Sequence, residues 1–196
     1  MNDRYILVCS PMRTGSTFVY NFFNECASEY IVKKYERSPM DFIEGTDFAP
    51  VIFRHPVACL GSLLEFLDRP FNIKYITKYY YLLRAQFEWA NQLLLEFPNC
   101  AYELRYENFY NNIDFLVEWS KNNLSISIED KKLKEFTEKF NFDTIETMSE
   151  NNLNLFQQNH ISSGKGSNQN KIEKILETKL LYGELSKFSK EYGYDY

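Results

Sequence analysis

Cysteine and histidine are scarce in this chain of 196 residues. The four cysteines, Cys9, Cys26, Cys59 and Cys100, are scattered without a C-x-x-C pair, and the two histidines have no metal-ligand spacing. This pattern argues against a zinc site, because zinc sites take closely spaced Cys and His ligands. It also argues against a disulfide framework. We therefore expect reduced thiols and a cytoplasmic protein.

Positively charged residues are fewer than negatively charged ones. The chain has 22 Lys and Arg against 27 Asp and Glu, which gives a formal net charge of −5 and an isoelectric point near 5.2. A general nucleic-acid binder needs a basic surface, so no nucleic-acid partner is expected. A single anionic ligand remains compatible with this charge, because a few focused cations suffice to bind it.

Long hydrophobic runs, repeats, linkers and low-complexity tracts are lacking. The N-terminus runs from Met-Asn-Asp-Arg directly into Tyr5-Ile6-Leu7-Val8, which is too short for a signal peptide or a membrane span. Apolar residues nevertheless make up 44% of the chain and aromatic residues 17%, enough to form a core and to exclude disorder. The sequence predicts one domain over residues 1–196, with no transmembrane segment.

Short apolar runs alternate with segments of helical periodicity. Strands are predicted at 4–9, 30–35, 50–54 and 100–105. Helices are predicted from about residue 16, after residue 56, over 73–96, near 113–122 and 130–140, and from about 171 to 190, with a polar loop over 157–171. This alternation predicts an α/β fold, a P-loop-like three-layer arrangement with a central parallel β-sheet flanked by helices.

The segment after the first predicted strand is the strongest functional signal. It reads Ser10-Pro11-Met12-Arg13-Thr14-Gly15-Ser16-Thr17 and leads into a helix. Backbone N–H groups at a helix start, hydroxyl groups and a cation suit a phosphate-like group. Against the pattern G-x-x-x-x-G-K-[ST], Ser10 replaces the first glycine and Ser16 replaces the lysine. The third strand ends in Arg54 instead of an aspartate that would hold Mg²⁺, so no metal is expected.

Arg54 and Ser62 form a second signal. Arg54 follows the third strand, and Ser62 lies almost two turns into the next helix, so its hydroxyl can face the strand end. Open parallel sheets bind ligands at the carboxyl ends of their strands. The pair therefore suits a second phosphate group.

These two motifs together resemble those of the sulfotransferases that use 3′-phosphoadenosine 5′-phosphosulfate (PAPS). The matching residues are Arg13-Thr14-Gly15-Ser16-Thr17, then Arg54-x-Pro56 with Ser62 eight residues after the arginine. The resemblance implies that the loop holds the 5′-phosphosulfate of the donor and that Arg54 and Ser62 hold its 3′-phosphate. The product of the donor would be 3′,5′-adenosine bisphosphate.

Three further stretches are similar to the same family. Leu104-Arg105-Tyr106-Glu107-Asn108-Phe109 is similar to a family strand end, which implies that Tyr106 lies by the adenine. Asn159-His160-Ile161-Ser162-Ser163-Gly164-Lys165-Gly166 matches a basic loop that closes over the nucleotide, which implies a contact from Lys165, and Lys171 follows as the next cation. The ending Tyr192-Gly193-Tyr194 resembles the common family ending.

The resemblance implies in-line transfer of a sulfuryl group to a hydroxyl or amine of a small-molecule or saccharide acceptor. Arg13 and the helix N-terminus would stabilise the charge that builds on the leaving phosphate. The acceptor must lose a proton, so a general base is needed. Family analogy favours Glu36, and the alternatives are Asp41, Glu44, His55 and His160.

Two other functions remain open. The first is a small P-loop phosphotransferase or kinase, against which the missing P-loop lysine and strand-end aspartate count. The second is a nucleotide-binding regulatory protein without catalysis, which would keep its affinity for the donor and show no turnover.

Overall fold

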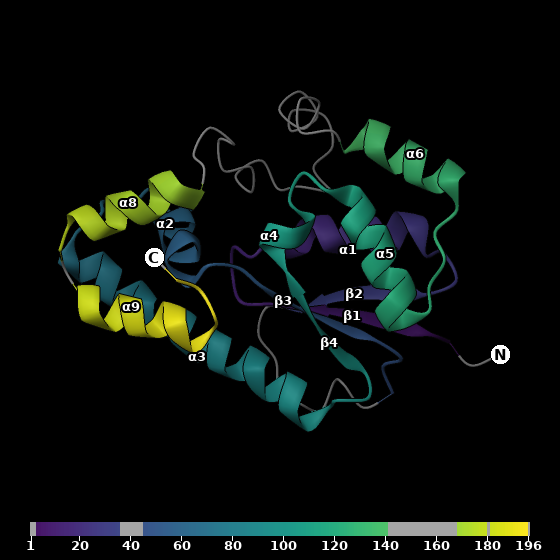
Figure 1. Cartoon of the computed structure of the whole chain (residues 1–196), viewed down its shortest axis with the longest axis horizontal. Helices are drawn as coiled ribbons and strands as arrows, with labels where there is room; N and C mark the ends of the chain where they lie inside the picture. Colours follow the sequence, from purple (N-terminus) through teal and green to yellow (C-terminus); the bar gives the residue numbers. More distant parts are fainter. Residues whose placement is uncertain (1–2, 36–44, 141–167, 180, 196) are drawn as a thin grey trace.

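The computed structural model describes residues 3–35, 45–140, 168–179 and 181–195. Its centre is a sheet of four parallel strands in the order β2-β1-β3-β4 (Figure 1). The strands are β1 (Tyr5–Cys9), β2 (Ile31–Tyr35), β3 (Ala49–Phe53) and β4 (Ala101–Arg105). Their bounds lie within one residue of the predicted ones, and the predicted α/β fold with a central parallel sheet is confirmed.

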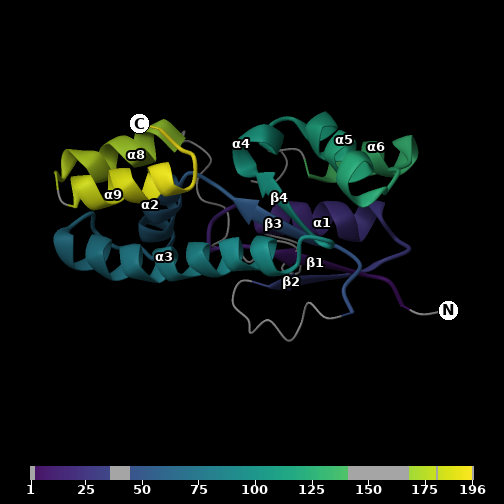
Figure 2. The same cartoon turned by 60° about the horizontal axis from the view of Figure 1, so that its bottom comes forward.

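Helices cover both faces of the sheet (Figure 2). They are α1 (Ser16–Cys26), α2 (Pro56–Phe66), α3 (Ile73–Glu96), α4 (Tyr106–Phe109), α5 (Ile113–Leu124), α6 (Asp130–Lys139), α8 (Asn168–Glu177) and α9 (Tyr182–Glu191). The short helix α4 was not predicted, because its four residues are too few to show a helical period.

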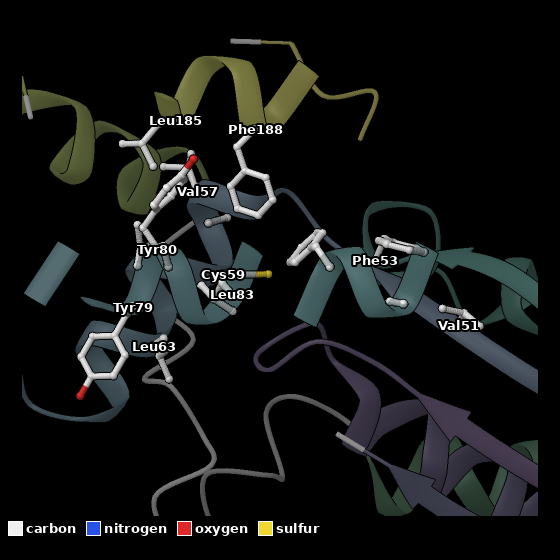
Figure 3. Close-up of a cluster of buried hydrophobic side chains, with 14 of the residues drawn as sticks. Val51, Phe53, Val57, Cys59, Leu63, Tyr79, Tyr80, Leu83, Leu185 and Phe188 are labelled. Atoms are coloured by element: carbon white, nitrogen blue, oxygen red, sulfur yellow. The ribbon is translucent and has the colours of Figure 1, made fainter. Parts of the chain in front are cut away.

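Each strand sends alternate side chains to opposite faces, as a pleated strand must. Leu7 of β1 and Val51 of β3 enter a core that α2, α3, α8 and α9 cover, shown in Figure 3. Val8 of β1 and Ile52 of β3 enter a second core under α1, α4, α5 and α6. The protein therefore has three layers, with a separate apolar core on each face of the sheet.

The long helix α3 follows its predicted bounds, residues 73–96. Its buried stripe includes Ile76, Leu83, Phe87 and Ala90, which recur at helical spacing. The helix begins where the side chain of Asn72 accepts a hydrogen bond from the backbone N–H of Tyr75 at 3.3 Å. A polar N-cap of this kind supplies an acceptor for an N–H group that has no partner within the helix.

The prediction of one C-terminal helix over 171–190 was wrong. The chain forms two helices, α8 and α9, and between them Lys179 and Leu181 adopt left-handed backbone angles with φ of 52° and 54°. Both helices contact α2, and Ile175 of α8 and Leu185 of α9 are fully buried in the same core. The break lets both apolar faces reach that core, which a single straight helix would not do. Residues 168–171, predicted as loop, are helical.

Candidate anion-binding site

The loop between β1 and α1 turns sharply at the carboxyl end of the sheet. Arg13 and Gly15 have positive φ values of 67° and 87°, and α1 begins directly after Gly15. Left-handed residues in a loop that leads into a helix are typical of concave backbone sites that bind anions. The Thr14 hydroxyl donates to the backbone oxygen of Pro11 at 3.0 Å and thereby holds the loop in this shape.

Gly15 lies against the ring of Tyr106. A Cβ atom at this position would stand 2.6 Å from Cδ2 and 2.9 Å from Cε2 of Tyr106. The positive φ and this close approach both require glycine. The ring of Tyr106, which we expected beside an adenine ring, therefore packs against the loop at Gly15.

The long helix α3 holds the other side of the loop. The side-chain oxygen of Gln86 accepts a hydrogen bond from the backbone N–H of Met12 at 3.0 Å. Within the described part of the chain, no hydrogen-bond partner is found for the buried Gln86 Nε2 or for the buried Ser10 hydroxyl. Sequence reasoning missed Gln86, because it lies 74 residues from Met12 in the middle of an amphipathic helix.

Arg13 and Ser62 meet, although they come from different elements. Arg13 Nε donates to Ser62 Oγ at 3.2 Å, and the guanidinium carbon lies 4.6 Å from the centre of the Phe66 ring. Ser62 and Phe66 stand one turn apart on α2, so one face of this helix carries both contacts.

Arg54 completes the cluster from the end of β3. Its Nη1 donates to the backbone oxygen of Arg13 at 2.9 Å, and its guanidinium carbon lies 4.3 Å from the centre of the Tyr106 ring. The buried thiol of Cys59 on α2 lies 3.7 Å from the same Arg13 oxygen. The predicted residues Arg13, Gly15, Arg54, Ser62 and Tyr106 are therefore brought together in space.

A lysine of β2 contacts the start of α1, directly after the loop. Lys34, near the end of β2, donates from Nζ to the hydroxyl of Thr17 at 2.8 Å. Thr17 is in the first turn of α1, directly after the buried Ser16. Lys34 could not be recognised as a site residue from the sequence, because only the parallel pairing of β2 beside β1 brings it to α1.

His55 follows Arg54 and is enclosed by the C-terminal segment. Its backbone N–H donates to Glu107 Oε1 at 2.9 Å, while Tyr194 donates from its hydroxyl to Glu107 Oε2 at 3.1 Å. Burial and the Arg54 charge lower the pKa of His55 to about 4. The imidazole is therefore neutral at pH 7 and is a weak base.

Lys171 lies on α8 and is buried against α2. Its Nζ is 3.5 Å from Glu65 Oε2. Gly61 permits this packing, because a Cβ atom there would lie 2.9 Å from Lys171 Cβ. The residue expected next to a closing loop thus belongs to a helix in the core.

Five predicted residues lie outside the part that the structure describes: Glu36, Asp41, Glu44, His160 and Lys165. Among the described residues, no group of three or more His, Cys, Asp or Glu side chains could hold a metal ion. No helix in the described ranges is long and apolar enough to cross a membrane.

Comparison of the sequence with protein-family models gave no match, and comparison with curated proteins gave no significant match.

Proposed function

We propose that this protein is a PAPS-dependent sulfotransferase. The observation that carries the proposal is the convergence of Arg13, Arg54 and Ser62 beside an anion-binding loop at the carboxyl edge of a parallel sheet. Two arginines, a hydroxyl and a helix N-terminus suit a ligand with two separate anionic groups. PAPS carries a phosphosulfate at one end and a phosphate on its ribose.

The two ends of the donor would bind to different parts of the cluster. The backbone of residues 13–17 and the Lys34 ammonium would bind the 5′-phosphosulfate, since Lys34 contacts Thr17 at the start of α1. Arg54 and Ser62 would bind the 3′-phosphate. Arg13 belongs to both parts, because its backbone is in the loop while its guanidinium reaches Ser62.

In the proposed reaction, the bond between sulfur and the bridging oxygen of the donor breaks as a bond forms between sulfur and the acceptor oxygen or nitrogen. Negative charge builds on the leaving phosphate, where the α1 N-terminus and the Arg13 guanidinium, turned from Ser62 toward the loop, would stabilise it. The acceptor gives its proton to a base, for which Glu36 remains the leading candidate and Asp41, Glu44 and His160 the alternatives. His55 is disfavoured, because its lowered pKa of about 4 makes it a weak base.

The acceptor in this proposal is a small molecule or a saccharide. Phe66 lies beside the Arg13 guanidinium at the end of α2, and Phe71 and Tyr75 follow it in the chain; each of the three is only partly buried. Aromatic side chains of this kind offer a stacking surface to a sugar or phenol.

Calorimetric titration with 3′,5′-adenosine bisphosphate, AMP and ATP with Mg²⁺ tests the proposal. We expect micromolar binding of the bisphosphate, with AMP at least about tenfold weaker for want of the second phosphate. A preference for ATP with Mg²⁺ would overturn the proposal in favour of a phosphotransferase. Binding of the bisphosphate without transfer to any acceptor would favour a regulatory protein.

A further inference from the structure

Two charged side chains are buried in the described part of the chain: Arg54 in the candidate site, and Lys171 on α8, which packs on the helix that carries Ser62. Arg54 is 7% exposed and Lys171 is 3% exposed. Burying a cation is unfavourable unless an anion compensates for its lost hydration. The burial of Lys171 therefore calls for an explanation.

The packing of α8 on α2 brings Lys171 to this position. The two helices touch at Gly61, where the backbone oxygen of Lys171 would lie 3.2 Å from an added Cβ atom. Ser62, the partner of Arg13, is the next residue of α2. The Lys171 ammonium then runs along α2 toward Glu65.

Glu65 compensates Lys171 incompletely. The distance from Lys171 Nζ to Glu65 Oε2 is 3.5 Å, longer than the 2.7–2.9 Å of a strong charge-assisted hydrogen bond. The same carboxylate is shared with Lys174, whose Nζ lies 3.2 Å from Oε1. Lys174 is 55% exposed and has access to water, whereas Lys171 does not.

The positive charges of Arg54 and Arg13 destabilise the charged form of Lys171. Burial lowers the pKa of Lys171, and the charges of Arg54 and Arg13 lower it further, while Glu65 opposes them. An anion placed among Lys171, Arg54 and Arg13 would be attracted by all three cations and would relieve their mutual repulsion.

We propose that Lys171 is a third ligand for the ribose phosphate of the donor, beside Arg54 and Ser62, and that Glu65 is an internal anion which that phosphate displaces from Lys171. This inference rests on the proposed function. Glu65 holds the buried ammonium while the site is empty of nucleotide. On binding, the phosphate takes over Lys171, and Glu65 keeps Lys174.

The test is the affinity of three variants for 3′,5′-adenosine bisphosphate and for AMP, measured by calorimetry. Lys171→Ala should weaken bisphosphate binding about 10- to 100-fold, the loss typical of a hydrogen bond to a charged group, and change AMP binding by less than about threefold. Glu65→Gln should tighten bisphosphate binding about two- to tenfold, because it removes the competing anion. Lys174→Ala is the matched control, since it removes an exposed lysine from the same helix and the same carboxylate. Its affinity should stay within about twofold of wild type.

The opposite signs expected for Lys171 and Glu65 separate this role from a structural one. If the pair only held α8 on α2, both substitutions would loosen the site, and Glu65→Gln would weaken binding. That result, or unchanged bisphosphate affinity in Lys171→Ala, would overturn the inference. Where Lys171→Ala does not fold, Glu65→Gln alone decides. Failure of these variants while the wild type still prefers the bisphosphate over AMP refutes only the inference, whereas a wild type that does not bind the bisphosphate refutes the proposed function too.

Discussion

Replacing Gly15 with alanine tests the architecture of the loop between β1 and α1. The added methyl group would stand 2.6 Å from Cδ2 and 2.9 Å from Cε2 of Tyr106, far inside van der Waals contact. The backbone φ of 87° also disfavours any residue with a Cβ atom. Alanine therefore meets two separate penalties at this position.

The size of each penalty can be estimated. A left-handed backbone costs alanine about 1–2 kcal/mol, and forcing a methyl group into filled space costs about 1–3 kcal/mol. Gly15→Ala should therefore lower the free energy of unfolding by about 2–5 kcal/mol. Gly45 is the matched control, because its φ is 88° and no atom of the described residues lies within 4 Å of its added Cβ. Gly45→Ala should show the backbone penalty alone, about 1–2 kcal/mol.

Thermal or urea unfolding of these variants measures the difference. For a chain of this size, 1 kcal/mol shifts Tm by about 2–4 °C, so Gly15→Ala should melt about 4–20 °C below wild type and Gly45→Ala about 2–8 °C below it. The double variant Gly15→Ala/Tyr106→Ala should recover at least about 1 kcal/mol relative to the sum of its single variants. The packing of Tyr106 against the loop would be refuted if Gly15→Ala and Gly45→Ala lost the same free energy of unfolding. It would also be refuted if the losses of Gly15→Ala and Tyr106→Ala were strictly additive in the double variant.

Three further predictions concern the charges and the buried imidazole. Arg13→Ala should reduce kcat at saturating donor by about 100-fold or more, because in the proposed reaction the cation stabilises the leaving phosphate; an unchanged kcat would remove Arg13 from the chemistry. Lys34→Ala should weaken AMP and 3′,5′-adenosine bisphosphate by the same factor, roughly three- to tenfold, because Lys34 contacts the loop at Thr17; unequal losses in calorimetry would contradict this placement. The pKa of His55, lowered to about 4, makes the folded state bind fewer protons than the unfolded state between about pH 6.5 and pH 4. The free energy of unfolding should therefore decrease as the pH is lowered from about 6.5 to about 4, by up to about 3 kcal/mol. In urea unfolding, His55→Asn should remove this part of the pH dependence. An unaltered pH profile would argue against a buried neutral His55.

The fold could be predicted where one segment carries its own signal. The apolar stripe of α3 spans six turns, and the strands are short apolar runs bounded by turn residues, so local periodicity sufficed. The break between α8 and α9 could not be predicted in this way. Neither Lys179 nor Leu181 is a turn-forming residue type, and each adopts a left-handed backbone because both flanking helices bury apolar residues against α2.

The residues of the candidate site also fall into those that could be predicted and those that could not. The loop residues and the Arg54–Ser62 spacing could be read from the sequence, because each lies within one strand–loop–helix unit. Gln86 and Lys34 could not, because each contacts the loop from another element through tertiary packing. Long-range contacts of this kind leave no pattern in a single sequence.

The most direct test of the proposed donor site compares the affinities of 3′,5′-adenosine bisphosphate and AMP in the wild type and in Arg54→Ala. AMP lacks only the second phosphate, so it reports any general damage that the substitution causes at the site. We expect that the wild type prefers the bisphosphate and that Arg54→Ala reduces this preference about 10- to 100-fold. Equal losses for both nucleotides would contradict the assignment of the second phosphate to Arg54, and no preference in the wild type would contradict the sulfotransferase proposal itself.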